Sequence, residues 1–184
     1  MERIAVFFAE GYEEIEALTV VDILRRAQID VVMTSITSDR QVTGSHGITV
    51  EMDSLFDELD FETIDMIVLP GGLGGTKLLE AFTPLMKQVA SFYEKGKWIA
   101  AICAAPSILG HRGYLVGRKA CSYPTFESHL EGATVCTDQG AVTDGNIITG
   151  RGMGCSIDFA LEILTKLRGE QIAGQMAEKI VYRK

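Results

Sequence analysis

Short, nearly all-apolar runs recur along the chain, and amphipathic helical patterns separate several of them. The runs cover residues 4–8, 31–33, 65–69, 98–102 and 146–149. They are rich in β-branched and aromatic residues, as is typical of strands buried on both faces of a parallel sheet. Helical spacing of apolar residues covers 15–26, 84–92 and 157–167. This alternation predicts an α/β fold with a mostly parallel sheet and helices on its faces.

Length and charge restrict the classes of protein that the chain can belong to. With 184 residues, 47% of them hydrophobic, the chain has the size and composition of a single packed domain, which we place at residues 1–184. The formal net charge of -8 disfavours nucleic acid and anionic membranes as partners, because both bind clustered Lys and Arg. No apolar run reaches the roughly 18 residues of a membrane span. The first residues lack the pattern of a signal peptide, so we expect a cytoplasmic protein.

Cysteine and histidine spacing predicts neither disulfides nor a metal site. The four cysteines contain no C-x-x-C pair and are interpreted as thiols: Cys103, Cys121, Cys136 and Cys155. The three histidines have no mutual helical spacing and no neighbouring cysteine pair: His46, His111 and His129. We therefore expect no metal.

Cys103 stands directly after the run at 98–102, between small alanines and ahead of Pro106. A strand-to-helix turn of this kind exposes the side chain above the sheet and directs nearby N–H groups toward it. A helix N-terminus also favours a thiolate and lowers the pKa of a thiol. The alternative is that Cys103 is a small buried hydrophobic residue, as most free cysteines are.

Three carboxylates, Glu13, Glu14 and Glu16, follow Gly11 where the first strand leads into the first helix. Acids are favourable in the first turn of a helix, which is sufficient to explain them. Ile15, Leu18 and Glu16 do not all face the same way, so one acid is expected to point inward while the others stay solvated. A buried carboxyl tends to be protonated near neutral pH and can then donate or transfer a proton. The residues alone do not choose among the three acids.

Three loops are predicted at the carboxyl ends of strands, where ligands gather in open α/β sheets. They cover Glu10–Glu16, Pro70–Gly75 and Cys103–Pro106.

With these motifs in this order, the chain resembles the ThiJ/PfpI superfamily, in its DJ-one branch. The resemblance rests on Gly11–Glu16, Leu69–Gly72, Ala100–Pro106 and Thr149–Gly152, and it spans nearly the whole chain. It implies a flavodoxin-like three-layer sandwich, similar to class I glutamine amidotransferases, and a homodimer.

The same resemblance implies roles for individual residues. Cys103 corresponds to the nucleophilic or oxidation-sensitive cysteine, and Glu16 to the buried acid that touches it. The N–H groups of Gly72 and Ala104 correspond to oxyanion donors. Many members carry a histidine ahead of a proline near the cysteine, but here Tyr123 precedes Pro124. Tyrosine donates a hydrogen bond but is a poor base at neutral pH, so Tyr123 is at most an auxiliary residue, and His111 or His129 would have to reach the site from elsewhere.

The resemblance leaves more than one function open. The first is a cofactor-independent glyoxalase or deglycase acting on dicarbonyls such as methylglyoxal, or on their early adducts with proteins. The second is a redox-responsive stress protein or chaperone that senses oxidation at Cys103. Both require a reactive, accessible thiol, so the sequence does not separate them. A peptidase or amidase is a weaker alternative because the histidine is missing.

Overall fold

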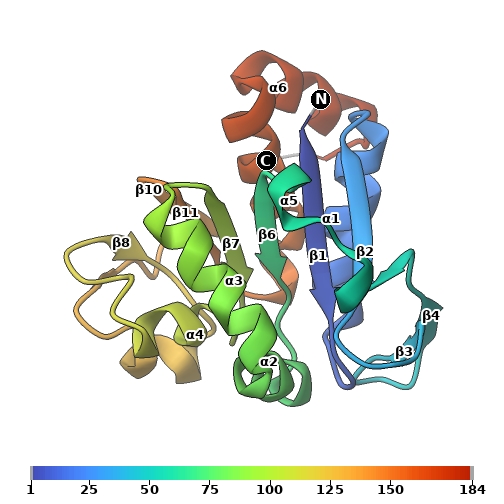
Figure 1. Cartoon of the computed structure of the whole chain (residues 1–184). Coiled ribbons are helices and arrows are strands. Elements are labelled where there is room, and N and C mark those ends of the chain that lie inside the picture. The colour runs from blue at the N-terminus through green and yellow to red at the C-terminus, as the bar shows by residue number, and fades with distance from the viewer. Residues whose placement is uncertain (1, 183–184) are drawn as a thin grey trace.

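A seven-stranded sheet forms the centre of the computed structural model, which describes residues 2–182 (Figure 1). The strand order is β10-β11-β7-β6-β1-β2-β5. The strands are β1 (Arg3–Phe8), β2 (Asp30–Ser35), β5 (Ser54–Leu55), β6 (Met66–Leu69), β7 (Trp98–Ile102), β10 (Ala141–Asp144) and β11 (Ile147–Gly150). Every neighbouring pair is parallel except β10 with β11. The predicted, mostly parallel sheet is confirmed.

Helices cover both faces of this sheet (Figure 1). One face carries α1 (Glu14–Arg26) and α5 (Ser156–Arg168), with α6 (Glu170–Lys179) packed on α5. The other carries α2 (Leu73–Ala81), α3 (Thr83–Glu94) and α4 (Pro106–His111). Successive side chains of β1 enter opposite cores, Val6 on the α1 side and Phe7 on the α3 side. The run at 4–8 is all-apolar because both faces of β1 are buried. With helices on both faces of the sheet, the fold is the expected three-layer sandwich.

Two small strand pairs lie outside the main sheet. The antiparallel pair β3 (Gln41–Thr43) and β4 (Thr49–Glu51) forms a hairpin. It is held to the acidic segment by hydrogen bonds from the Gly11 N–H to the Thr43 carbonyl and from the Ser45 N–H to the Tyr12 carbonyl, both 2.8 Å. The parallel pair β8 (Lys119–Ala120) and β9 (Thr134–Val135) was not anticipated. The hairpin therefore becomes part of the surroundings of the first acidic loop.

The predicted loop at Pro70–Gly75 is shorter than expected, because α2 already begins at Leu73. Gly75 lies in its first turn, where a Cβ atom would come within 2.8 Å of the Tyr12 Cα. Glycine here permits close helix packing rather than a flexible loop. Among the described helices, none has both the length and the apolar character that crossing a membrane requires.

Candidate active site

The three predicted loops meet at the carboxyl ends of β1, β6 and β7, at the lower edge of the sheet in Figure 1. The Glu13 N–H donates to the Gly71 carbonyl at 3.0 Å, which joins the acidic segment to the turn after β6. The Cys103 N–H donates to the Gly150 carbonyl at 2.9 Å, which joins the cysteine turn to the end of β11. The crevice expected from the topology is thus built from these loops.

Cys103 adopts a left-handed backbone conformation, with a φ of 65°. A residue with a Cβ atom in this region carries a strain of order 1–3 kcal/mol, and such strain is concentrated at functional sites. The turn brings the N–H groups of Gly72 and Ala104 into hydrogen-bonding position at the sulfur. Gly72 has a φ of 88°, and a Cβ there would lie 2.5 Å from the Gly11 carbonyl oxygen. The structure therefore forms the elbow, with both expected N–H donors at the thiol.

Glu16 is fully buried beside this thiol. Its Oε2 accepts a hydrogen bond from the Gly71 N–H at 3.0 Å, while its Oε1 has no hydrogen-bond partner among the described residues. The Cys103 thiol interacts with the same carboxyl. Gly71 makes the approach of the two groups possible, because a Cβ there would lie 2.4 Å from Glu16 Oε2 and 2.6 Å from the Cys103 Cβ. Of the three acids, Glu16 is the one that reaches the cysteine.

Burial raises the pKa of Glu16 to about 7, and the charge of Glu13 acts in the same direction, whereas the thiol and the Gly71 N–H lower it. Near neutral pH the carboxyl is therefore present in both its neutral and its ionised form. An acid with this pKa is suited to take up and return protons.

The pKa of Cys103 differs from the expected lowered value. Burial, followed by the charge of Glu16, raises it to about 12, although the N–H groups of Gly72 and Ala104 act against this rise. The thiol is half-buried and next to the carboxyl of Glu16, and both features disfavour the charged thiolate. Sulfur therefore keeps its proton until a base removes it, and the carboxylate form of Glu16 is the base in contact with it.

The expectation that only one acid is buried is wrong, because Glu14 is also buried. Burial disfavours its ionised form, but its own N–H and donors from His46 and Ser45 hold the pKa of Glu14 at about 2. Glu14 therefore remains a carboxylate that anchors the β3–β4 hairpin. The hairpin lies more than 25 residues away in sequence, so the spacing of the acids gave no sign of it.

A pocket of about 420 Å³ opens above Cys103 and Glu16. Its wall includes Leu73, Phe126 and Met153 together with Tyr123, the residue that precedes Pro124 where a histidine was expected. The Tyr123 N–H donates to the Cys103 carbonyl at 2.8 Å, which fixes this segment to the elbow. The mostly apolar wall with a thiol and carboxyl at its base suits a small, largely uncharged molecule.

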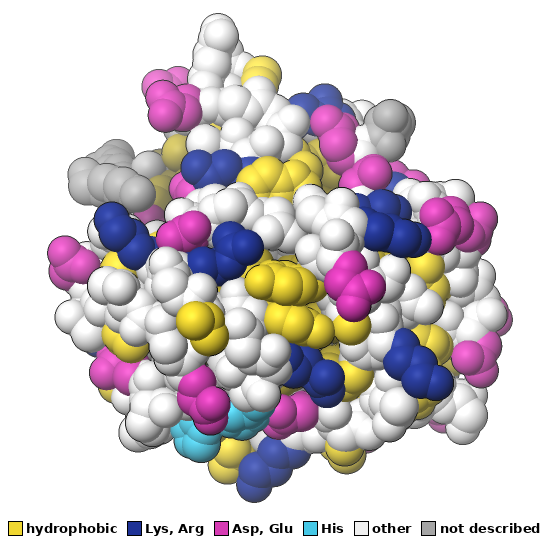
Figure 2. All heavy atoms as spheres, turned by 60° about the vertical axis from the view of Figure 1, so that its left-hand side comes forward, with side chains coloured by type: hydrophobic (Ala, Val, Ile, Leu, Met, Phe, Trp, Pro, Cys, Tyr) yellow, Lys and Arg dark blue, Asp and Glu magenta, His cyan; other side chains and the backbone are white. Residues whose placement is uncertain are grey.

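His46 is the histidine that lines this pocket, and the sequence did not point to it. His111 and His129 instead bond to each other, Nε2 to Nδ1 at 2.9 Å, and His111 also bonds to Glu80 at 2.7 Å. Neither lines the pocket around Cys103. Figure 2, which brings the α4 side of the molecule forward, has histidine side chains gathered at the surface beside acidic ones. His111 and His129 therefore do not reach the pocket around Cys103 and contact other polar side chains instead.

The remaining cysteines do not reach the site pocket. All four cysteines are free thiols, as expected. Burial raises the pKa of Cys121 to about 11, and burial also raises the pKa of Cys155. Among the cysteines, only Cys103 combines the elbow with a carboxyl partner.

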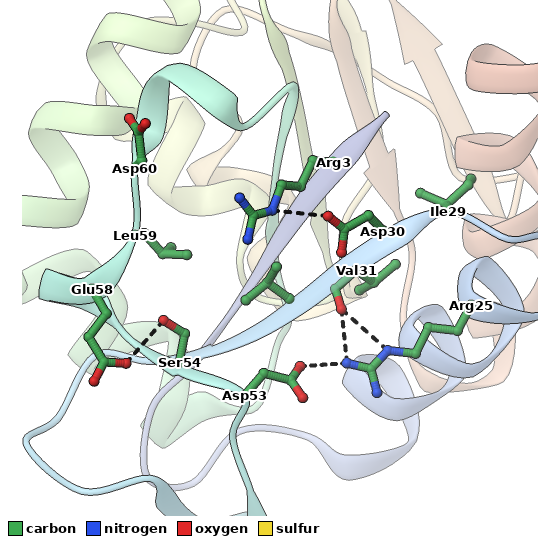
Figure 3. A pocket seen from close by; sticks show the side chains of 11 residues that line it. Arg3, Arg25, Ile29, Asp30, Val31, Asp53, Ser54, Glu58, Leu59 and Asp60 are labelled. Atoms are coloured by element: carbon green, nitrogen blue, oxygen red, sulfur yellow. Dashed lines mark hydrogen bonds and ion pairs between the residues drawn. The ribbon is translucent and has the colours of Figure 1, made fainter. Parts of the chain in front are cut away.

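A larger hollow, of about 560 Å³, lies at the other end of β1 and β2 (Figure 3). Its two arginines are already paired with carboxylates, since Arg25 contacts Asp53 and Arg3 contacts Asp30 at 3.1 Å. It also lies away from the carboxyl ends of β1, β6 and β7, where the three loops meet. We therefore interpret it as a structural ion-pair region and not as the active site.

Comparisons with known proteins agree with this geometry. The model of the DJ-1/PfpI family matches residues 2–166. DJ-1 homolog B of Arabidopsis thaliana is 33% identical over 99% of this chain, but the chain spans only 42% of that relative. Protein dj-1beta of Drosophila melanogaster is 33% identical, with 96% of this chain and 95% of the relative covered. The glutathione-independent glyoxalase DJR-1.2 of Caenorhabditis elegans is 30% identical, with 95% and 93% covered.

Solved structures give the same result. The C103A mutant of a DJ-1 superfamily protein from Salmonella typhimurium superimposes with a TM-score of 0.93 at 35% identity, with both chains covered completely. Oxidised Toxoplasma gondii DJ-1 superimposes with a TM-score of 0.92 at 32% identity, again with complete coverage.

Fold and site together define a flavodoxin-like α/β protein with a strained cysteine elbow and a buried acidic partner. The match over residues 2–166 makes the assignment more specific. The chain belongs to the DJ-1/PfpI family, which confirms the resemblance seen in its sequence motifs.

Proposed function

We propose that the chain is a cysteine-dependent, cofactor-independent enzyme that converts reactive dicarbonyls, such as methylglyoxal, into 2-hydroxy acids, or acts on their early protein adducts. The proposal rests chiefly on one observation, the contact of the Cys103 thiol with a buried carboxyl whose pKa is about 7. The similarity to a nematode glyoxalase supports the same class of substrate.

In the first step the Glu16 carboxylate takes the proton of the Cys103 thiol while the sulfur attacks the aldehyde carbon. A C–S bond forms, and the carbonyl electron pair moves to oxygen. The N–H groups of Gly72 and Ala104 stabilise this oxyanion until Glu16 returns the proton to it, giving a neutral hemithioacetal. The raised thiol pKa is compatible with this step, because attack needs only proton transfer to Glu16 and not a preformed thiolate.

In the second step Glu16 removes the C1 hydrogen of the hemithioacetal as a proton and delivers it to C2. The C1 hydroxyl proton passes to the C2 oxygen, so the adduct becomes the thioester of a 2-hydroxy acid with no net oxidation. Water then cleaves the thioester, releasing lactate from methylglyoxal and restoring the thiol. General acid–base help of this kind contributes roughly 10² to 10⁴ in rate.

The second candidate function is a redox response at the same cysteine. A peroxide would transfer one oxygen atom to the thiol, giving a sulfenic acid, and would itself be reduced to an alcohol, or to water in the case of hydrogen peroxide. A second equivalent would give sulfinic acid. Glu16 in its neutral form and the N–H groups of Gly72 and Ala104 would bind the new oxygens. The likeness to an oxidised DJ-1 structure favours keeping this candidate. A peptidase or amidase has less support, because Tyr123 replaces the histidine base.

Turnover of methylglyoxal to lactate in metal-free buffer tests the proposal. Wild type and Cys155→Ala, which removes another partly buried thiol, are expected to be active. Cys103→Ala and Glu16→Gln are expected to lose at least 10²-fold in turnover. Equal turnover by wild type and Cys103→Ala would overturn the proposal. If all four proteins are inactive, but peroxide forms a sulfinic acid at Cys103 in preference to Cys155, the redox function replaces it.

A further inference from the structure

Four side chains with metal-ligand atoms converge at the mouth of the pocket from two distant segments. Glu13 and Glu14 stand at the start of α1, and Ser45 and His46 form the turn of the β3–β4 hairpin. Ser45 Oγ lies 3.1 Å from Glu13 Oε2, 3.1 Å from Glu14 Oε2 and 2.9 Å from His46 Nδ1. His46 Nδ1 lies 3.1 Å from Glu14 Oε2 and 3.7 Å from Glu13 Oε2.

These separations match the edges of a tetrahedral metal site. With metal–ligand bonds of about 2.0 Å, tetrahedral ligands stand roughly 3.3 Å apart. The ligand atoms of the two glutamates and the histidine all lie within 4.8 Å of one another. We propose that Glu13, Glu14 and His46, with the Ser45 hydroxyl as fourth ligand, form a binding site for a divalent transition metal of the Zn²⁺ type.

Charge and proton count give an independent reason for a cation here. Ser45 has one hydroxyl proton and cannot donate it to both carboxylates. Within residues 2–182, His46 is the sole ion-pair partner of Glu13 and of Glu14, and its side chain is 68% exposed. The Glu13 side chain is 14% exposed and that of Glu14 is 5% exposed, so two largely buried carboxylates share one weak cationic partner. A divalent ion supplies the missing charge.

The surroundings meet the other requirements of a metal site. Glu14 Oε1 accepts from the His46 N–H at 2.7 Å, which leaves Oε2 directed toward the cluster. A Cβ at Gly44 would lie 2.4 Å from the Glu14 carboxyl, so glycine allows the hairpin to close over it. Glu13 and His46 line the pocket, which provides an entry path. The imidazole favours Zn²⁺ over Mg²⁺ or Ca²⁺, which take oxygen ligands.

Metal binding would connect α1 to the β3–β4 hairpin and fix one wall of the pocket. It requires no step of the chemistry proposed at Cys103, so the two proposals fail or succeed separately.

Calorimetric titration with Zn²⁺ and visible spectroscopy with Co²⁺ test the site, both in a Cys103→Ala background that removes the nearest thiol. The matched variants are His46→Gln, Glu13→Gln and, as control, His111→Gln, which alters the other surface histidine cluster.

We expect one metal ion per chain and a tetrahedral Co²⁺ spectrum. Affinity should fall at least tenfold in His46→Gln and in Glu13→Gln and stay unchanged in His111→Gln. His46 is exposed, so its substitution should leave the fold intact, as circular dichroism would verify. Absence of saturable binding at millimolar Zn²⁺, or equal affinity in the background protein and His46→Gln, would overturn the proposal. Loss confined to His111→Gln would also overturn it, because the ion would then occupy the other histidine cluster.

Discussion

Glu16 links proton binding to the stability of the fold. Its folded pKa of about 7 exceeds its ordinary value of 4.5, so between these values the folded state holds a proton that the unfolded chain has released. The stabilising contribution is fully present below about 4.5 and is lost as the pH rises through 7. At 1.36 kcal/mol per pKa unit, it amounts to roughly 3 kcal/mol.

The unfolding free energy of the wild type should therefore fall between pH 5 and pH 8, and this fall should be smaller in Glu16→Gln. Urea unfolding of wild type, Glu16→Gln and Glu62→Gln measures this difference. Glu62 is the matched control, since its side chain is 78% exposed. An identical pH dependence in wild type and Glu16→Gln would show that Glu16 already ionises at its ordinary pKa.

Gly71 is a second residue on which the site depends, because a Cβ there would collide with both Glu16 and Cys103. Gly71→Ala is expected to force the acid and the thiol apart and to lower turnover at least 10²-fold, as the loss of acid–base help would. Gly174→Ala is the control, since nothing lies within 4 Å of its Cβ position and alanine favours the α6 helix. Full turnover by Gly71→Ala would mean that the Glu16 contact is dispensable.

At the scale of elements, the elbow between β7 and α4 stores strain at Cys103. Its φ of 65° suits glycine better than any residue with a Cβ. Cys103→Gly and Cys103→Ala both lack the thiol, but glycine relieves the strain. We expect Cys103→Gly to be more stable than Cys103→Ala by about 1 kcal/mol in urea unfolding. Alanine as the more stable substitution would argue against a strained elbow.

The sequence predicted the central elements well and the peripheral ones poorly. Runs such as 4–8 and 98–102 are buried on both sides, so composition alone identifies them. The strands β5, β8 and β9 have two residues each, too few for any pattern. Gly74 and Gly75 suggested a loop, but both lie in the first turn of α2. Glycine is used there because the helix packs closely against the segment that contains Gly11 and Tyr12, which the local sequence does not reveal.

At the scale of the whole molecule, the sequence predicted those parts of the site whose structure depends on residues adjacent in the chain. The elbow is local, so Cys103 was identified from its flanking residues, and the motifs that resemble the family added Glu16. His46 and the second buried acid, Glu14, depend on the hairpin folding back over α1. The thiol pKa was mispredicted because burial and the charge of Glu16 arise from the assembled fold.

The homodimer implied by the family resemblance remains a prediction for the whole molecule. Symmetric pairing is common among small α/β domains. Sedimentation equilibrium at micromolar concentration should yield twice the chain mass of 20.1 kDa. A single species of 20.1 kDa at all concentrations tested would remove the prediction.

The central claim is that the buried Glu16 carboxyl titrates near neutral pH and so serves as base and acid for Cys103. Carbon-13 NMR of the glutamate carboxyls, with Glu16→Gln to assign the resonance, measures this titration directly. We predict a midpoint at about pH 7 for Glu16. A midpoint near the ordinary value of 4.5 would contradict the proposed proton transfer, since the carboxylate would then be too weak a base to take the thiol proton.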